Sequence, residues 1–266
     1  MKPVDQAGIA LEFLEDESHM RAFDRLIWGL RVRRDAAANE VSEWEDLRTL
    51  ASQIKEHTLS HLAYYLEMFE ASAVRNGVTV HWARDAHEHN QIVYDILNAR
   101  GAKHLVKSKS MLTEECDLRP FLERRGVQVT ETDLGERIQQ LDDQPPTHIV
   151  GPAFQKTPKQ VADLFHRVYG SDPGNADPVY LAGVMRGHTR PLFLSADAGM
   201  TGANFVLAQT GAIVTVTNEG NADLSANKNN GRVCSRITPA RYTGSALPGS
   251  EPYTRLNKSA TCSGVF

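Results

Sequence analysis

Short apolar runs alternate with amphipathic segments between residues 78 and 170, and this alternation constrains the fold more than any other feature of the chain. Helices are predicted between the runs, because the intervening segments carry apolar residues at helical spacing. One of them, Met111–Arg125, is expected to break at Pro120, because proline lacks the N–H that a helix interior needs. The predicted strands are Val78–Trp82, His104–Lys107, Val127–Glu131 and His148–Gly151. Strands joined through helices predict an α/β fold, with a mainly parallel sheet flanked by helices.

Two long helices are predicted before the sheet, in residues 1–76. Apolar residues at helical spacing predict one helix over Glu17–Asp35 and a second from Ser42 to near Gly77. The second helix would be roughly 50 Å long at the usual rise per residue. We therefore expect an N-terminal helical arm, which either covers one face of the domain or contacts a partner.

The last two predicted strands, Ala203–Ala208 and Ala212–Thr217, follow a further helical stretch that ends near Leu194. Gln209–Gly211 is the whole connection between them. A connection that short permits only an antiparallel hairpin.

Composition excludes several classes of protein. The net charge of −4 gives no basic surface for nucleic acid. No apolar run approaches the roughly 20 residues of a membrane span, and the acidic N-terminus lacks a signal core, so a cytoplasmic protein is expected. Cys116, Cys234 and Cys262 form no CxxC pair, and the i, i+4 pair His57 and His61 lacks a third ligand. No metal-binding residue is therefore predicted.

The first candidate site is the run Lys107-Ser108-Lys109-Ser110, where a predicted strand ends and a helix begins. Backbone N–H groups at such a junction, together with two ammonium groups and two hydroxyls, can bind a small anion. The alternative is that Ser110 only caps the helix and the lysines lie in solvent. The sequence leaves both interpretations open.

The second candidate site is residues 217–221, after the last strand. Glu219 could be a nucleophile or a general base, and Gly220 would let the backbone approach a ligand. The alternative is a simple turn, since these residues are good turn formers. The polar segment 199–204 before the hairpin favours a binding surface, and we expect both clusters to face one cavity. We predict Glu219 as catalytic, and as substrate-binding residues Lys107, Ser108, Lys109, Ser110, Thr201, Asn204, Thr217, Asn218, Gly220 and Asn221.

Longer sequence blocks occur in a fixed order along the chain. They are Glu43-Trp44-Glu45, VKSKSM at 106–111, TEE at 113–115, ETDLGE at 131–136, DDQPPTHIV at 142–150 and DAGMTGANFVLAQTGAIVTVTNEGN at 197–221. Together they resemble the lactate-utilisation protein B family, over about residues 15–227. The resemblance implies a LUD-type α/β domain at 77–227, whose fold is similar to that of the sugar-phosphate isomerase and CoA-transferase superfamily. It also implies that 107–110 and 217–221 line the ligand pocket.

The resemblance carries a functional implication. Complete family members continue into a ferredoxin-like half that binds two [4Fe–4S] clusters, and they act with two partner proteins to oxidise L-lactate to pyruvate and pass electrons onward. This chain is then expected to be a component of such a complex that lacks the cluster-binding half and carries no cofactor itself.

The resemblance stops near Asn227, where the character of the sequence changes. Residues 228–266 are rich in Lys and Arg, hold one acidic residue (Glu251) and show no hydrophobic periodicity. We expect this basic tail to be disordered, or to be translated out of frame or from a truncated gene.

Two other classes of function stay open. One is a stand-alone isomerase, acyl-transferase or ligase that uses Glu219 on a phosphorylated or CoA-linked substrate. The other is a non-catalytic scaffold that binds a small anion and docks partners through the long helix.

Overall fold

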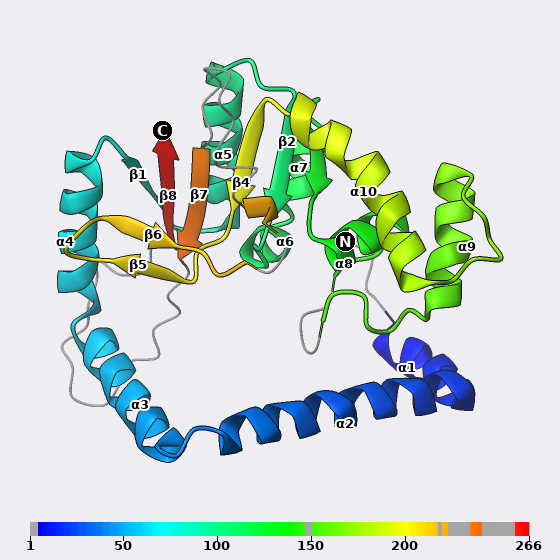
Figure 1. The fold of residues 1–266 in the computed structure, drawn as a ribbon. Coiled ribbons are helices and arrows are strands. Elements are labelled where there is room, and N and C mark those ends of the chain that lie inside the picture. Colours follow the sequence, from blue (N-terminus) through cyan, green and yellow to red (C-terminus); the bar gives the residue numbers. More distant parts are fainter. Residues whose placement is uncertain (1–4, 147–150, 218–219, 223–234, 241–258, 266) are drawn as a thin grey trace.

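The computed structural model describes residues 5–146, 151–217, 220–222, 235–240 and 259–265 (Figure 1). The helices are α1 Gln6–Glu15, α2 Glu17–Asn39, α3 Trp44–Ser60, α4 Leu62–Arg75, α5 Ala86–Ala99, α6 Leu112–Glu115, α7 Leu118–Glu123, α8 Leu134–Leu141, α9 Pro158–Tyr169 and α10 Pro178–Ser195. The strands are β1 Thr79–Ala83, β2 His104–Ser108, β3 Gln128–Glu131, β4 Ala198–Thr201, β5 Phe205–Leu207, β6 Ala212–Val214, β7 Ser235–Ala240 and β8 Ser259–Val265. In the predicted strand His148–Gly151, residues 148–150 lie outside the described residues. No helix within the described ranges combines the length and the apolar character that crossing a bilayer requires.

A three-stranded parallel sheet lies at the centre, in the order β3-β2-β4. Lys107 of β2 is in register with Glu131 of β3, and Ser108 of β2 with Thr201 of β4. The prediction of an α/β fold with a parallel sheet and flanking helices is confirmed. Because the strands are parallel, these polar residues all fall at the same, carboxyl-end edge.

Helices cover both faces of the parallel sheet, and the alternation of side chains along β2 shows how. Leu105 packs in a core with Val93 of α5 and Leu122 of α7. Val106, on the opposite face, packs against Phe193 of α10. Successive side chains of a strand point to opposite faces, so Lys107 lies on the α5–α7 side with Leu105.

A second core joins α8, α9 and α10 beside the sheet. Ile138, Phe165, Leu181 and Met185 are its buried centre. Helix α9 begins with Pro158 and a capping box in which Thr157 and Gln160 bond each other's backbone N–H groups. Helix α8 of this layer forms one wall of the larger pocket at the candidate site.

The predicted hairpin is confirmed: β5 and β6 pair antiparallel, with Phe205 opposite Val214. Its turn lies against α4, as Figure 1 shows. Asn76 donates to the carbonyl oxygen of Thr210 at 2.7 Å. A Cβ at Gly211 would lie 2.4 Å from the nitrogen of Ala73, so this close contact requires glycine.

Strand β1 was predicted in the parallel sheet, and this is wrong. It pairs antiparallel with β8, which in turn pairs antiparallel with β7, in a separate sheet. A local pattern of strand and helix does not specify a pairing with residues nearly two hundred positions downstream.

Two segments of the tail predicted to be disordered are therefore strands, β7 and β8. The other tail residues, 228–234, 241–258 and 266, lie outside the described residues. The division of the chain at residues 76 and 227 stays a prediction.

The helical arm comprises α1 to α4, but the predicted long helix is two helices. The chain leaves helical geometry at His61 (φ −119°, ψ 26°), between α3 and α4. The imidazole Nδ1 of His61 hydrogen-bonds the carbonyl oxygen of His57 at 2.9 Å, and side-chain bonds of this kind compete with the helix ladder. Helices α2 and α3 hold no buried residue, and α2 runs apart from the sheet in Figure 1.

The break expected at Pro120 lies instead at Asp117, whose φ of 52° ends α6 and precedes α7. Pro120 sits in the first turn of α7. Proline is tolerated there, because the first N–H groups of a helix have no intrahelical partner.

Candidate functional site

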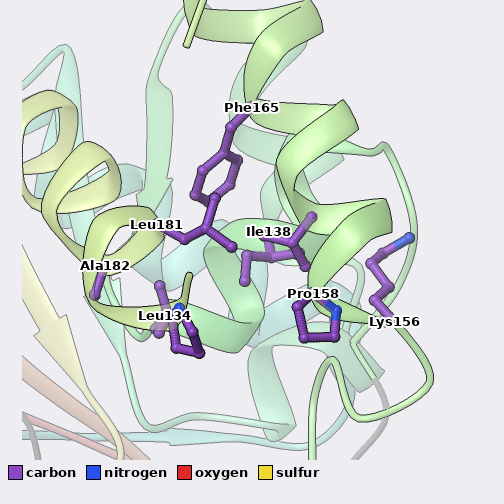
Figure 2. A pocket seen from close by; sticks show the side chains of 9 residues that line it. Leu134, Ile138, Lys156, Pro158, Phe165, Leu181 and Ala182 are labelled. Atoms are coloured by element: carbon purple, nitrogen blue, oxygen red, sulfur yellow. The ribbon is translucent and has the colours of Figure 1, made fainter. Parts of the chain in front are cut away.

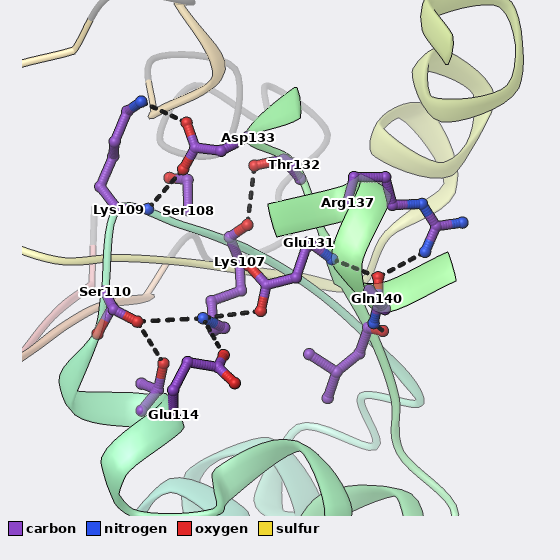
Figure 3. A network of polar contacts seen from close by, with 12 residues as sticks. Lys107, Ser108, Lys109, Ser110, Glu114, Glu131, Thr132, Asp133, Arg137 and Gln140 are labelled. Carbon is purple, nitrogen blue, oxygen red and sulfur yellow. Dashed lines mark hydrogen bonds and ion pairs between the residues drawn. The ribbon is translucent and has the colours of Figure 1, made fainter. Parts of the chain in front are cut away.

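The polar residues at the carboxyl edge of the parallel sheet form two connected networks (Figure 3). The first centres on Lys107, whose side chain is only 2% exposed. Its Nζ lies 2.8 Å from Oε1 of Glu131 and 2.9 Å from Oε1 of Glu114, and it donates to the carbonyl oxygen of Ser110 at 3.2 Å. The three ammonium protons thus have three acceptors within the protein, and Lys107 serves this network rather than an open surface.

Burial sets the protonation of this network. Burial, together with the nearby charge of Glu114, raises the pKa of Glu131 to about 8 against the attraction of Lys107. Burial also opposes the charge of Glu114, but the Lys107 ammonium outweighs it and holds that pKa below its ordinary value. Burial likewise disfavours the ammonium of Lys107, yet the two glutamates raise its pKa overall. Near neutral pH the triad therefore holds one cation, one carboxylate and one protonated carboxyl group, with no net charge.

The second network centres on Asp133, which is 1% exposed. Its Oδ2 accepts the main-chain N–H of Lys109 at 2.8 Å, and its Oδ1 forms an ion pair with Lys109 Nζ. Asn221 donates its amide to Oδ1 of Asp133 at 2.9 Å and to Oγ1 of Thr132 at 3.2 Å. Thr132 in turn donates to the carbonyl oxygen of Lys107 at 2.8 Å. Asp133 therefore joins the loop after β2, the start of α8 and the segment after the hairpin.

Backbone geometry at Lys109 fixes the direction of its side chain. Lys109 takes a positive φ of 54°, in the left-handed region. Gly202 lies against it, because a Cβ on Gly202 would be 1.9 Å from the carbonyl oxygen of Lys109. The strained loop packs between a glycine and a buried carboxylate, and these contacts hold the Lys109 side chain in one direction.

An open pocket of about 630 Å³ lies over these networks. It falls within the volume range of sites for small organic ligands. Its lining residues are Lys109, Ser110, Met111, Leu134, Gly135, Glu136, Ile138, Gly151, Pro152, Ala153, Phe154, Asn204 and Val216. The wall combines one cationic side chain, the first turn of α8 and a carboxyl group.

Glu136 is the acid–base candidate of this pocket. Burial, together with the negative charge of Asp133, raises its pKa to about 7, while Lys109 and Lys107 act in the opposite direction. A carboxyl group with a pKa near neutral can accept or release a proton at working pH.

The structure brings together most of the residues predicted from the sequence. Lys109, Ser110 and Asn204 line the pocket. Lys107, Ser108, Thr201 and Asn221 lie buried beneath it. The Oγ1 of Thr217 donates to Asn221 at 3.3 Å, and Gly220 has a positive φ of 68°. The predicted catalytic residue Glu219 and its neighbour Asn218 lie outside the described residues, so their proposed roles stay predictions.

The acidic residues of the site were not predicted as site residues from the sequence. Glu114, Glu131, Asp133 and Glu136 belong to the sequence blocks, and none of them was predicted as a site residue. A signal existed: the run 131–133 begins at the last residue of a predicted strand, as the lysine-serine run does. Carboxyl ends of neighbouring parallel strands meet at one edge, which places the two runs together.

The chain's own residues do not fit a [4Fe–4S] cluster. Such a cluster takes four cysteine thiolates, and these 266 residues include three cysteines. In the described part of the chain, no three His, Cys, Asp or Glu side chains are grouped to hold a metal ion. Electron transfer through a cluster is therefore no part of the chemistry assigned to these residues.

Comparison with known proteins finds relatives over most of the chain. The family model described as LUD domain matches residues 66–227. "Lactate utilization protein B" of Geobacillus thermodenitrificans (strain NG80-2) is 48% identical over 194 residues, which are 73% of this chain and 40% of that protein. Proteins of the same name from Oceanobacillus iheyensis and Bacillus cereus (strain B4264) are 43% and 41% identical, over 73% of this chain and 40% and 41% of their own lengths. The chain thus spans about two fifths of these relatives, and no solved structure matches it. The chain belongs to the LUD domain family.

Proposed function

We propose that this chain supplies a carboxylate-binding domain for lactate utilisation, as a component of a cytoplasmic complex that oxidises L-lactate to pyruvate. The observation that carries the proposal is the pocket wall on which Lys109 and Glu136 lie together. The names of the curated relatives support lactate as the acid. Other proteins of lactate utilisation are the proposed partners, and the electron acceptor belongs to them or to residues outside this chain.

In this proposal the two charged residues have separate tasks. The ammonium of Lys109, at the pocket surface with its side chain 20% exposed, attracts the carboxylate of the acid. Glu136 exchanges a proton with the hydroxyl group, because its pKa of about 7 allows both protonation states. The buried triad around Lys107 supports the loop that carries Lys109.

A binding experiment tests the first task. Calorimetry should detect L-lactate and pyruvate binding to the full chain, and binding should be lost in Lys109→Met. Lys159→Met is the matched control, because Lys159 is 78% exposed on α9 and pairs only with surface Asp163 in the described contacts. Circular dichroism should show that both variants fold. Equal binding by the wild-type chain and Lys109→Met would reject the proposal.

A non-catalytic scaffold is the second candidate, favoured by the exposed apolar side chains of α2 and α3, such as Trp28 and Ile54. The variant Glu136→Gln distinguishes a domain that takes part in lactate oxidation from a non-catalytic scaffold. If Glu136 moves a proton, the variant binds lactate but slows lactate oxidation when the chain is combined with its partner proteins. If the domain is a scaffold, oxidation is unchanged. The stand-alone enzyme that uses Glu219 stays a prediction.

A further inference from the structure

A smaller hollow of about 180 Å³ lies beside the pocket, between α8, α9 and α10 (Figure 2). Leu134 and Ile138 line both the hollow and the pocket. Four residues apart on α8, they lie on the same face of that helix, about 6 Å apart along its axis. The hollow therefore continues the larger pocket along one face of α8.

The lining of this hollow is almost wholly apolar. It comprises Leu134, Ile138, Lys156, Pro158, Val161, Phe165, Pro178, Leu181 and Ala182. Lys156 donates its ammonium protons to Oδ2 of Asp142 at 2.5 Å and to Oε1 of Gln144 at 3.2 Å. In Figure 2 its nitrogen points away from Phe165 and Leu181. Lys156 thus contributes its aliphatic stem to the lining, and its charge is neutralised elsewhere.

We propose that the site accepts 2-hydroxy acids whose aliphatic side chain is longer than the methyl group of lactate. The carboxylate would lie at Lys109 and the hydroxyl group at Glu136, and the side chain would pass Leu134 into the apolar hollow. This inference rests on the proposed function, because the carboxylate of the ligand keeps the contact proposed for lactate and only the side chain of the ligand is longer. A three-carbon acid leaves most of the 630 Å³ pocket unfilled and reaches none of the hollow. Because Leu134 and Ile138 line both spaces, a chain of several methylenes would pass along them into the hollow.

The affinity series follows from burial of hydrocarbon. Each methylene removed from water should lower the Kd about fourfold, until the hollow is full. The probes are L-lactate, L-2-hydroxybutanoate, L-2-hydroxyhexanoate and L-2-hydroxy-4-methylpentanoate, titrated by calorimetry into the full chain. The two six-carbon acids should bind at least tenfold more tightly than L-lactate.

Substitutions in the lining of the hollow test whether the side chain of the bound acid lies there. Ala182→Leu adds hydrocarbon to the lining and should abolish the preference for the longer acids while leaving L-lactate binding unchanged. Val161→Phe does the same from α9, should Ala182→Leu fail to fold. Gly183→Leu is the matched control, because Gly183 is exposed and a Cβ there meets nothing within 4 Å.

The outcomes separate this inference from the proposed function. If L-lactate binds and the longer acids bind no better, the inference is overturned and the proposed function stands. If the longer acids bind and L-lactate does not, with the preference lost in Ala182→Leu, the apolar extension stands and lactate is rejected. A chain-length preference that survives both Ala182→Leu and Val161→Phe overturns the inference, since the side chain then lies elsewhere. Binding of none of the acids rejects both.

Discussion

The main-chain nitrogen of Lys109 donates a 2.8 Å hydrogen bond to Oδ2 of Asp133. These residues follow the adjacent parallel strands β2 and β3. The ammonium group of Lys109 also forms an ion pair with the Asp133 carboxylate. The pocket wall that carries Lys109 is therefore held by a carboxylate from the neighbouring strand end.

Asp133→Ala should destabilise the fold by about 3 kcal/mol, because it removes a buried carboxylate that bonds Lys109 and Asn221. Urea unfolding, followed by circular dichroism, measures the change. Asp163→Ala is the control: it removes a surface pair with Lys159 and should cost about 0.5 kcal/mol or less. Equal effects of the two substitutions would contradict the role given to Asp133.

Lys107→Met should cost about 3–5 kcal/mol, because it leaves the carboxylate of Glu114 facing Glu131 in a buried site without its cation. The double variant Lys107→Met with Glu114→Gln should recover part of that loss, since it removes the unpaired charge as well. A double-mutant cycle in urea measures the coupling. Strictly additive effects would show that the two residues do not interact.

Much of this architecture follows from local patterns in the sequence, and the failures have a common cause. The helix start at Glu17 and the antiparallel hairpin of β5 and β6 were predicted from adjacent residues, and both are observed. The break at His61 and the pairing of β1 with β8 depend on a side-chain bond and on a distant strand, which local periodicity does not report.

The same distinction applies to the site. The lysine-serine run was found because its residue types suggest anion binding. Its counter-charges are Glu131, the last residue of the next strand of the sheet, and Asp133, which follows that strand, and the order of strands is a tertiary property. The alternation Leu105, Val106, Lys107 does predict that Lys107 lies on a buried face, once both faces of the sheet are known to be covered.

Glu131→Gln should change how stability depends on pH. The pKa of Glu131 is about 8 in the folded chain, above the ordinary value of 4.5 that it regains on unfolding. Between about pH 4.5 and pH 8 the folded state therefore holds a proton that the unfolded state releases, so this residue makes stability fall as pH rises. The difference in unfolding free energy, Glu131→Gln minus wild type, should increase from pH 5 to pH 8. A difference that stays constant would contradict the raised pKa.

Gly202→Ala should destabilise the chain, because its Cβ would lie 1.9 Å from the carbonyl oxygen of Lys109 and would push the loop out of place. We expect a loss of about 2 kcal/mol or more, as for other overpacked sites. Gly183→Ala is the matched control: its Cβ meets nothing within 4 Å in the exposed face of α10, and it should stabilise by about 0.5–1 kcal/mol. Thermal unfolding of the two variants should therefore shift in opposite directions.

Glu136 should make the affinity for L-lactate dependent on pH, if lactate is the ligand. Its pKa is about 7, so it is mostly neutral at pH 6 and mostly ionised at pH 8. An ionised Glu136 repels the lactate carboxylate in the same pocket, and a repulsion of about 1 kcal/mol corresponds to about fivefold weaker binding. Calorimetry at pH 6, 7 and 8 should show this loss in the wild-type chain and not in Glu136→Gln. Glu45→Gln, which changes an exposed residue paired with Arg48 on α3, should keep the wild-type pH profile. If Glu136→Gln also keeps that profile, the group that titrates near neutral pH in the pocket is not Glu136.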